Sequence, residues 1–242
     1  MARVTMVSVM PGLLGTYGDA GNAIALAHRV RARGHDARIL RTRPGDALPS
    51  GDIYLLGGAE DRAQPLAVDL IGDALADAVT RGAVVLGVCA GYQILGSTFA
   101  GSDGTAHAGL GLLDVTTTRL AERAVGDVVV DPALPLAALV GFENHHGGTR
   151  LGPGAQPLGT VRRGIGNGAG TEGAVQGRVL GTYLHGPVLA LNPEFADHLL
   201  SLVLGPLDPM EDAWAQGARE YRLLGKTDAR PTPARPAMTH RP

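Results

Sequence analysis

The chain has 242 residues, of which 45% are hydrophobic, 18% are charged and 4% are aromatic. This length and apolar content suffice for one α/β domain with a substantial core, which excludes a wholly disordered protein. The formal net charge of -2 provides no basic field for nucleic acid, so function must be argued from individual sites.

The first half of the chain alternates apolar, strand-like runs with helical segments. The runs expected to form strands are residues 4–10, 37–41, 52–58 and 83–88. Helices are expected at residues 20–34, with Asn22 as N-cap and Gly34 as the stop, and at residues 64–80. Apolar, β-branched runs without polar alternation are typical of a parallel sheet that is covered on both faces.

The second half has a different pattern. Beyond Gly109, short strand-like segments are separated by glycines, which indicates antiparallel or mixed strands, and a helix is expected at residues 192–204. The proline-containing tail at residues 226–242 is expected to be disordered, because it cannot bury enough apolar surface. We therefore predict one α/β domain over residues 1–225, with a mostly parallel central sheet flanked by helices and additional short mixed strands.

The single cysteine lies between a strand-like run and a helix-like segment. Cys89 directly follows residues 83–88 and precedes AGYQILG, and such a strand-to-helix turn is where α/β enzymes expose a nucleophile. Gly87 and Gly91 leave room for a sharp turn. The start of a helix would lower the pKa of the thiol, and the Ala90 N–H could point at a developing oxyanion.

A competing interpretation makes Cys89 a buried structural thiol, because free cysteines are among the most buried residue types. A lone cysteine cannot form an internal disulfide, which fits a reducing compartment such as the cytoplasm.

Three motifs in a fixed order make the catalytic interpretation more specific. GVCAGYQILG resembles the nucleophile segment of class I glutamine amidotransferases, LLGGAED their oxyanion loop and GTYLHGPVLALNP their histidine segment; these are residues 87–96, 55–61 and 181–193. The resemblance implies a flavodoxin-like α/β fold in which Cys89 attacks the side-chain amide of glutamine. It also implies that His185 transfers protons and that the backbone N–H groups of Gly58 and Ala90 bind the tetrahedral intermediate.

One position departs from the commonest form of that family. A glutamate two residues after the histidine usually orients the imidazole, but here Pro187 occupies that position. The CobB/CobQ-like branch, which includes cobyric and cobyrinic acid synthases and the glutaminase subunits of lipid II isoglutaminyl synthases, shares this lack. Either Glu143 or an acidic residue of a partner subunit is expected to orient His185.

Within that branch, four segments resemble the glutaminase subunits of lipid II isoglutaminyl synthases: residues 12–26, 54–64, 141–159 and 166–175. The resemblance implies that ammonia passes to a MurT-like Mur ligase, which amidates the D-glutamate α-carboxylate of lipid II to D-isoglutamine. No G-x-x-x-x-G-K-[ST] phosphate loop occurs, so ATP and Mg²⁺ are expected on the partner and no cofactor in this chain. The alternatives are the amidotransferase of a cobyric acid-type synthase and a non-catalytic scaffold for a synthetase.

The resemblance also suggests substrate contacts. Arg123 precedes a VGD segment similar to one whose arginine binds glutamine, with Arg119 as its rival and a solvated surface arginine as the alternative. Gln93 resembles a contact to bound glutamine, or is a polar residue on a helix surface. We expect no metal site at His145 and His146, because adjacent residues of a strand point to opposite faces.

The loop YGDAGN, residues 17–22, allows two interpretations. Its small residues before a helix could form a phosphate cradle, although a turn with an N-cap explains them equally well. Contact with the synthetase is the function we favour for it.

Overall fold

The computed structural model describes residues 1–224, and the predicted disordered tail at 226–242 lies outside the described residues. Six strands form a mostly parallel sheet in the order β11-β12-β4-β3-β1-β2. Only the β11–β12 pair is antiparallel among them. The strands are β1 (Arg3–Ser8), β2 (Asp36–Arg41), β3 (Ile53–Leu56), β4 (Val84–Val88), β11 (Ala174–Gln176) and β12 (Val179–Thr182).

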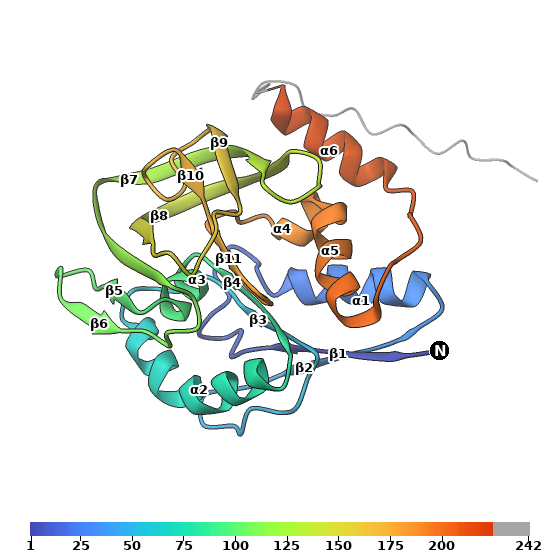
Figure 1. Ribbon diagram of the computed structural model, residues 1–242, viewed down its shortest axis with the longest axis horizontal. Helices are drawn as coiled ribbons and strands as arrows, with labels where there is room; N and C mark the ends of the chain where they lie inside the picture. Colours follow the sequence, from blue (N-terminus) through green and yellow to red (C-terminus); the bar gives the residue numbers. More distant parts are fainter. Residues whose placement is uncertain (225–242) are drawn as a thin grey trace, which may run out of the picture.

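Helices cover both faces of this sheet (Figure 1). They are α1 (Gly21–Ala32), α2 (Ala63–Thr80), α3 (Ala90–Leu95), α4 (Val188–Leu191), α5 (Pro193–Leu204) and α6 (Ala213–Leu223). The connections β1-α1-β2 and β3-α2-β4 run outward in opposite directions, so right-handed crossovers place α1 and α2 on opposite faces. Helices α4 and α5 pack against α1, whereas α3 packs against α2. Within residues 1–224, no helix has both the length and the apolar character needed to cross a membrane.

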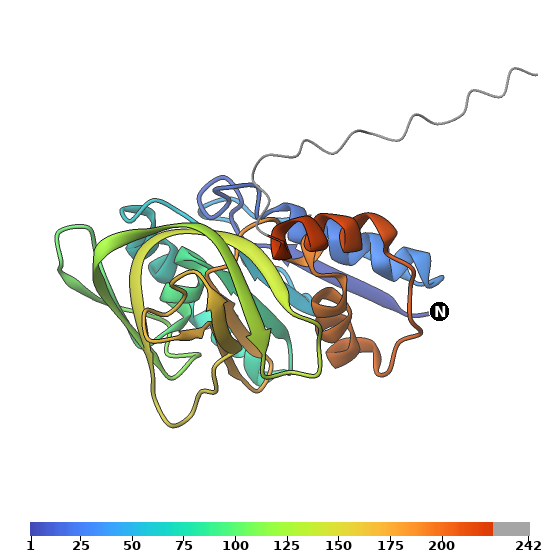
Figure 2. The same cartoon turned by 90° about the horizontal axis from the view of Figure 1, so that it is seen from above.

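A second, mainly antiparallel sheet has the order β10-β9-β7-β5-β6, with β8 also paired to β7. Its strands are β5 (Thr98–Ala100), β6 (Ala106–Ala108), β7 (Val115–Pro132), β8 (Leu139–Leu151), β9 (Gly159–Arg163) and β10 (Thr171–Glu172). Strands β7 and β8 curve together around one side of the molecule (Figure 2). The expectation of short segments was wrong for these two, because register shifts let β7 bend without ending.

The predicted elements of the first half are present, with one correction at a helix end. Asn22 does not cap α1; its side-chain oxygen accepts a hydrogen bond from the Leu189 N–H at 2.9 Å and so connects α1 to α4. Gly34 follows the helix with φ +75°, as its predicted role as a stop requires. Helix α6 had no counterpart in the sequence analysis.

The parallel sheet explains where a site forms. Loops that follow the carboxyl ends of β1, β3, β4 and β12 lie at the same edge of the sheet, which is where open α/β sheets bind ligands. These loops carry Asp19, Gly58, Cys89 and His185, respectively.

Candidate active site

Cys89 occupies a strained turn between β4 and α3. Its φ of 53° and ψ of -108° lie outside the regions that most residues adopt, as at the nucleophile turns of other α/β enzymes. A Cβ atom on Gly91 would lie 2.4 Å from the Leu56 carbonyl oxygen, and one on Gly87 would lie 2.6 Å from the Gly91 carbonyl carbon. Glycine at both positions therefore lets the turn pack directly on the sheet, as predicted.

The prediction of a lowered thiol pKa was wrong. Burial of Cys89 and the nearby charge of Asp19 raise its pKa to about 12, and the hydrogen bond from the Ala90 N–H only partly opposes them. Helix α3 has six residues and provides only a weak dipole. The resting side chain is therefore a neutral thiol at pH 7.

His185 is held in the loop after β12 by backbone and ring contacts. Its N–H donates to the Phe142 carbonyl at 2.8 Å, and its imidazole stacks on the Phe142 ring at a centroid distance of 5.3 Å. The Tyr17 ring meets it edge-on at 4.8 Å. The Nε2 atom is buried and has no hydrogen-bond partner within residues 1–224.

The carboxylate beside His185 belongs to Asp19 and not to Glu143. The two Asp19 oxygens lie 3.1 and 3.0 Å from Nδ1 of His185, and both side chains are almost completely buried. Glu143 instead lies 3.3 Å from the His145 ring and accepts the N–H groups of Ile165 and Gly166. Burial alone would raise the pKa of Glu143. These hydrogen bonds outweigh burial, so the pKa of Glu143 lies below its usual value.

Sequence reasoning missed Asp19 because its loop, residues 17–22, was interpreted as a turn with an N-cap that contacts the synthetase. The one available signal was an acidic residue after the first strand, at the same sheet edge as His185.

The two predicted oxyanion donors differ in their present partners. The Gly58 N–H donates to Asp19 at 2.8 Å, so in this conformation it does not point at open space. A Cβ on Gly58 would lie 2.9 Å from Cε1 of His185, which places this backbone directly against the imidazole. The Ala90 N–H, at the start of α3, is directed at the Cys89 thiol.

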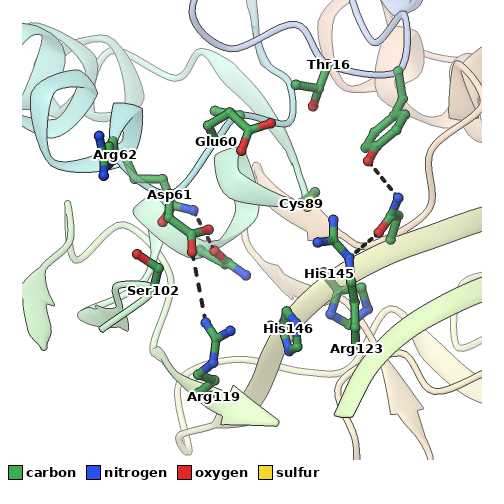
Figure 3. A pocket seen from close by; sticks show the side chains of 15 residues that line it. Thr16, Glu60, Asp61, Arg62, Cys89, Ser102, Arg119, Arg123, His145 and His146 are labelled. Carbon is green, nitrogen blue, oxygen red and sulfur yellow. Dashed lines mark hydrogen bonds and ion pairs between the residues drawn. The ribbon is translucent and has the colours of Figure 1, made fainter. Parts of the chain in front are cut away.

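A cavity of about 400 Å³ opens onto Cys89, and charged groups of both signs line it (Figure 3). The lining side chains include Thr16, Tyr17, Glu60, Asp61, Arg62, Gln64, Gln93, Arg119, Arg123, Asn144 and His146. Such a mixture suits a small polar ligand that carries both a positive and a negative charge.

Both candidate arginines reach this cavity. The Nε of Arg123 donates to Asn144 at 2.5 Å, and the Asn144 amide in turn donates to the Tyr17 hydroxyl at 2.6 Å. Arg119 lies 4.0 Å from Asp61. Partial burial and the two nearby guanidinium groups lower the pKa of His146.

Gln93 is buried, with 7% of its surface exposed, and is therefore not a residue of an exposed helix surface. Its amide accepts from Gln64 at 3.0 Å and donates to the Tyr183 hydroxyl at 3.4 Å. His145 stacks on Tyr183 with ring centroids 3.7 Å apart. No group of three or more His, Cys, Asp or Glu side chains within residues 1–224 is arranged to hold a metal ion.

Comparison with known proteins relates this site to one family. Residues 5–193 match the model of the CobB/CobQ-like glutamine amidotransferase domain. Subunit GatD of lipid II isoglutaminyl synthase (glutamine-hydrolyzing) from Staphylococcus aureus (strain N315) is 38% identical over 207 residues, covering 83% of this chain and 84% of that protein. Cobyric acid synthase from Xanthobacter autotrophicus (strain ATCC BAA-1158 / Py2) is 37% identical over 195 residues, covering 75% of this chain but 38% of that protein.

The fold has counterparts among solved structures. The crystal structure of a glutamine amidotransferase superposes with a TM-score of 0.58 at 24% sequence identity, covering 81% of this chain and 97% of that one. The flavodoxin-like architecture predicted from the sequence is thereby confirmed.

Proposed function

The chain belongs to the CobB/CobQ-like glutamine amidotransferase family, and on that premise we propose that it is the glutaminase subunit of a lipid II isoglutaminyl synthase. In this role it hydrolyses L-glutamine and delivers ammonia to a MurT-type ligase. That partner uses ATP and Mg²⁺ to amidate the D-glutamate α-carboxylate of lipid II, which gives D-isoglutamine. The observation that carries the proposal is Cys89 on a strained turn at a mixed-charge cavity, with the His185–Asp19 pair in loops at the same edge of the sheet.

The chemistry starts from a neutral thiol. As the Cys89 sulfur attacks the amide carbon of glutamine, its proton passes to Nε2 of His185, and the Asp19 carboxylate stabilises the resulting imidazolium. The imidazolium then gives this proton to the amide nitrogen, which leaves as ammonia when the C–N bond breaks. Water, deprotonated by His185, hydrolyses the glutamyl thioester to glutamate and restores the thiol.

The tetrahedral intermediate requires donors for its oxyanion. Ala90 supplies one N–H at the start of α3, and Gly58 supplies the second after exchanging the Asp19 oxygen for the substrate oxygen. Asp19 keeps its contact with Nδ1 of His185 during this exchange, because its two oxygens both lie close to that atom.

The two alternatives are less well supported. The GatD relative is 38% identical and covers 83% of this chain, whereas the cobyric acid synthase is 37% identical and covers 75%, so the match to the first extends over more of the chain. The scaffold hypothesis was motivated by the missing carboxylate beside His185, and Asp19 removes that motivation.

The test is glutamine-dependent ammonia release by the full chain, alone and co-expressed with a MurT-type ligase. We expect activity that Cys89→Ser abolishes, together with amidated lipid II as a product of the complex. A Cys89→Ser complex that retained wild-type ammonia release would refute the proposed nucleophile. Amidation of a corrinoid acid in place of lipid II would support the cobyric acid alternative.

A further inference from the structure

We propose that Asp61 binds the α-ammonium group of glutamine, opposite Arg123 at the α-carboxylate, and thereby makes the cavity selective for a zwitterionic amide. The inference rests on the proposed function, since it takes glutamine as the substrate. It adds a residue that determines specificity, in the loop that also carries the predicted oxyanion donor Gly58.

Charge near the thiol is the first observation. Among the groups that act on the pKa of Cys89, Arg123 lowers it and Asp61 raises it, whereas Asp19 is already engaged with His185. A positive and a negative side chain are therefore both within electrostatic range of the reacting sulfur. Glutamine carries charges that match this pair, because a short methylene chain separates its side-chain amide from the ammonium and carboxylate groups on Cα.

The position of Asp61 is the second observation. It lies in the loop between β3 and α2, directly after the Gly57-Gly58 turn, and its carbonyl oxygen accepts the N–H of Gln64 at 3.3 Å. The carboxylate points into the cavity towards Arg119, 4.0 Å away (Figure 3). No hydrogen bond within residues 1–224 uses the two carboxylate oxygens of Asp61, which leaves them available to an ammonium group.

Arg123 provides the opposite wall from β7. Because Asn144 accepts its Nε–H, the guanidinium group is held in place while its terminal nitrogens remain directed at the cavity. A planar guanidinium group in this position suits a carboxylate. Opposite charges on two elements, in the cavity that Cys89 also lines, define the orientation of a bound α-amino acid.

Glu60 is the natural rival, since it also lines the cavity. Asp61 differs from it in two respects: its carboxylate lies 4.0 Å from Arg119, and its charge contributes to the raised pKa of Cys89. The two neighbouring acids thus provide a matched pair, in which only Asp61 is expected to recognise the substrate.

The experiment compares L-glutamine with glutaramate, which is the same amide without the α-amino group. In the full complex, Asp61→Asn is expected to lower kcat/KM for glutamine about tenfold, as for loss of a partly exposed charged hydrogen bond. Activity on glutaramate should stay within about twofold, because that substrate has no ammonium group to lose. Glu60→Gln is the comparison variant, and its loss of kcat/KM for glutamine should be smaller than that of Asp61→Asn. Equal losses on both substrates, or no loss on glutamine, would overturn the proposal.

Binding to the Cys89→Ser background separates this inference from the proposed function. Calorimetry should show glutamine binding that weakens when Asp61→Asn is added, whereas glutaramate binding is unaffected. If that pattern appears without glutaminase activity in the wild-type complex, Asp61 recognition holds and the proposed function fails. If the complex is an active glutaminase and Asp61→Asn leaves glutamine binding unchanged, the function holds and this inference fails.

Discussion

Asp19 and His185 are 166 residues apart in the sequence, yet both Asp19 oxygens lie within 3.1 Å of Nδ1 of His185. A buried carboxylate at this nitrogen fixes the imidazole tautomer, and it leaves Nε2 as the ring nitrogen without a hydrogen-bond partner within residues 1–224. The same carboxylate accepts the Gly58 N–H, so one side chain links the proton-transfer residue to the oxyanion loop.

Asp19→Asn is expected to lower kcat for glutamine hydrolysis by on the order of 10²-fold or more, with little change in KM. An amide cannot stabilise the imidazolium, and it favours the wrong tautomer. Steady-state kinetics of the complex across pH 6–9 would measure this, with thermal melting as a control for folding. If Asp19→Asn retained wild-type kcat, Asp19 would not orient His185.

Alkylation of Cys89 tests its raised pKa directly, because the chain contains one cysteine. Burial and Asp19 place that pKa at about 12, so iodoacetamide should react slowly at pH 7. The rate should rise about tenfold per pH unit up to pH 10, since only the thiolate reacts. Mass spectrometry would follow the reaction, with the urea-unfolded chain as the reference for an ordinary cysteine. A rate plateau below pH 9 would contradict the raised value.

Asn144→Ala is expected to raise KM for glutamine about fivefold, the effect of losing one net hydrogen bond. The alanine frees the Nε of Arg123 and no longer holds the guanidinium group at the cavity. Asn144 also contacts the Tyr17 hydroxyl, so Tyr17→Phe serves as the control that removes only that second contact. An equal rise in KM for both variants would show that Tyr17, and not Arg123, transmits the effect.

Gly91→Ala is expected to destabilise the fold by about 1–3 kcal/mol, the usual range for overpacking. The new Cβ would lie 2.4 Å from the backbone oxygen of Leu56, which cannot move without disturbing β3. Gly217→Ala in α6 is the matched control, because nothing lies within 4 Å of its Cβ position. Gly217→Ala should increase the free energy of unfolding by about 0.5–1 kcal/mol, because alanine has a higher helix propensity than glycine. Urea unfolding monitored by circular dichroism would compare the two variants.

Glu172 should make folding stability depend on pH. Its side chain is fully buried and burial raises its pKa to about 8, from 4.5 in the exposed state. Between these values the folded chain keeps a proton that the unfolded chain releases, so stability falls as pH rises, by up to roughly 1.4 kcal/mol per pH unit. Glu172→Gln should match wild type at pH 5 and exceed it at pH 8 in thermal melting. A steeper loss of stability in the variant would show that the sign is wrong.

Several features of this protein follow from its sequence alone. The alternation of apolar runs with helical segments predicted the parallel sheet, because burial on both faces leaves a continuous apolar pattern. The turn at Cys89 was likewise predicted, since the strand, the two glycines and the helix start are neighbours in the chain. Three local motifs in order were sufficient to indicate the family that residues 5–193 match.

Other features were decided by tertiary structure. Asp19, rather than Glu143, meets His185 because a parallel sheet brings the loops after separate strands to one edge, whatever their distance in sequence. The raised pKa of Cys89 likewise depends on burial and on the charge of Asp19, whereas the local sequence showed only a helix start. Patterns carried by neighbouring residues could be recognised from the chain, whereas contacts between distant loops and the burial they produce exist only after folding.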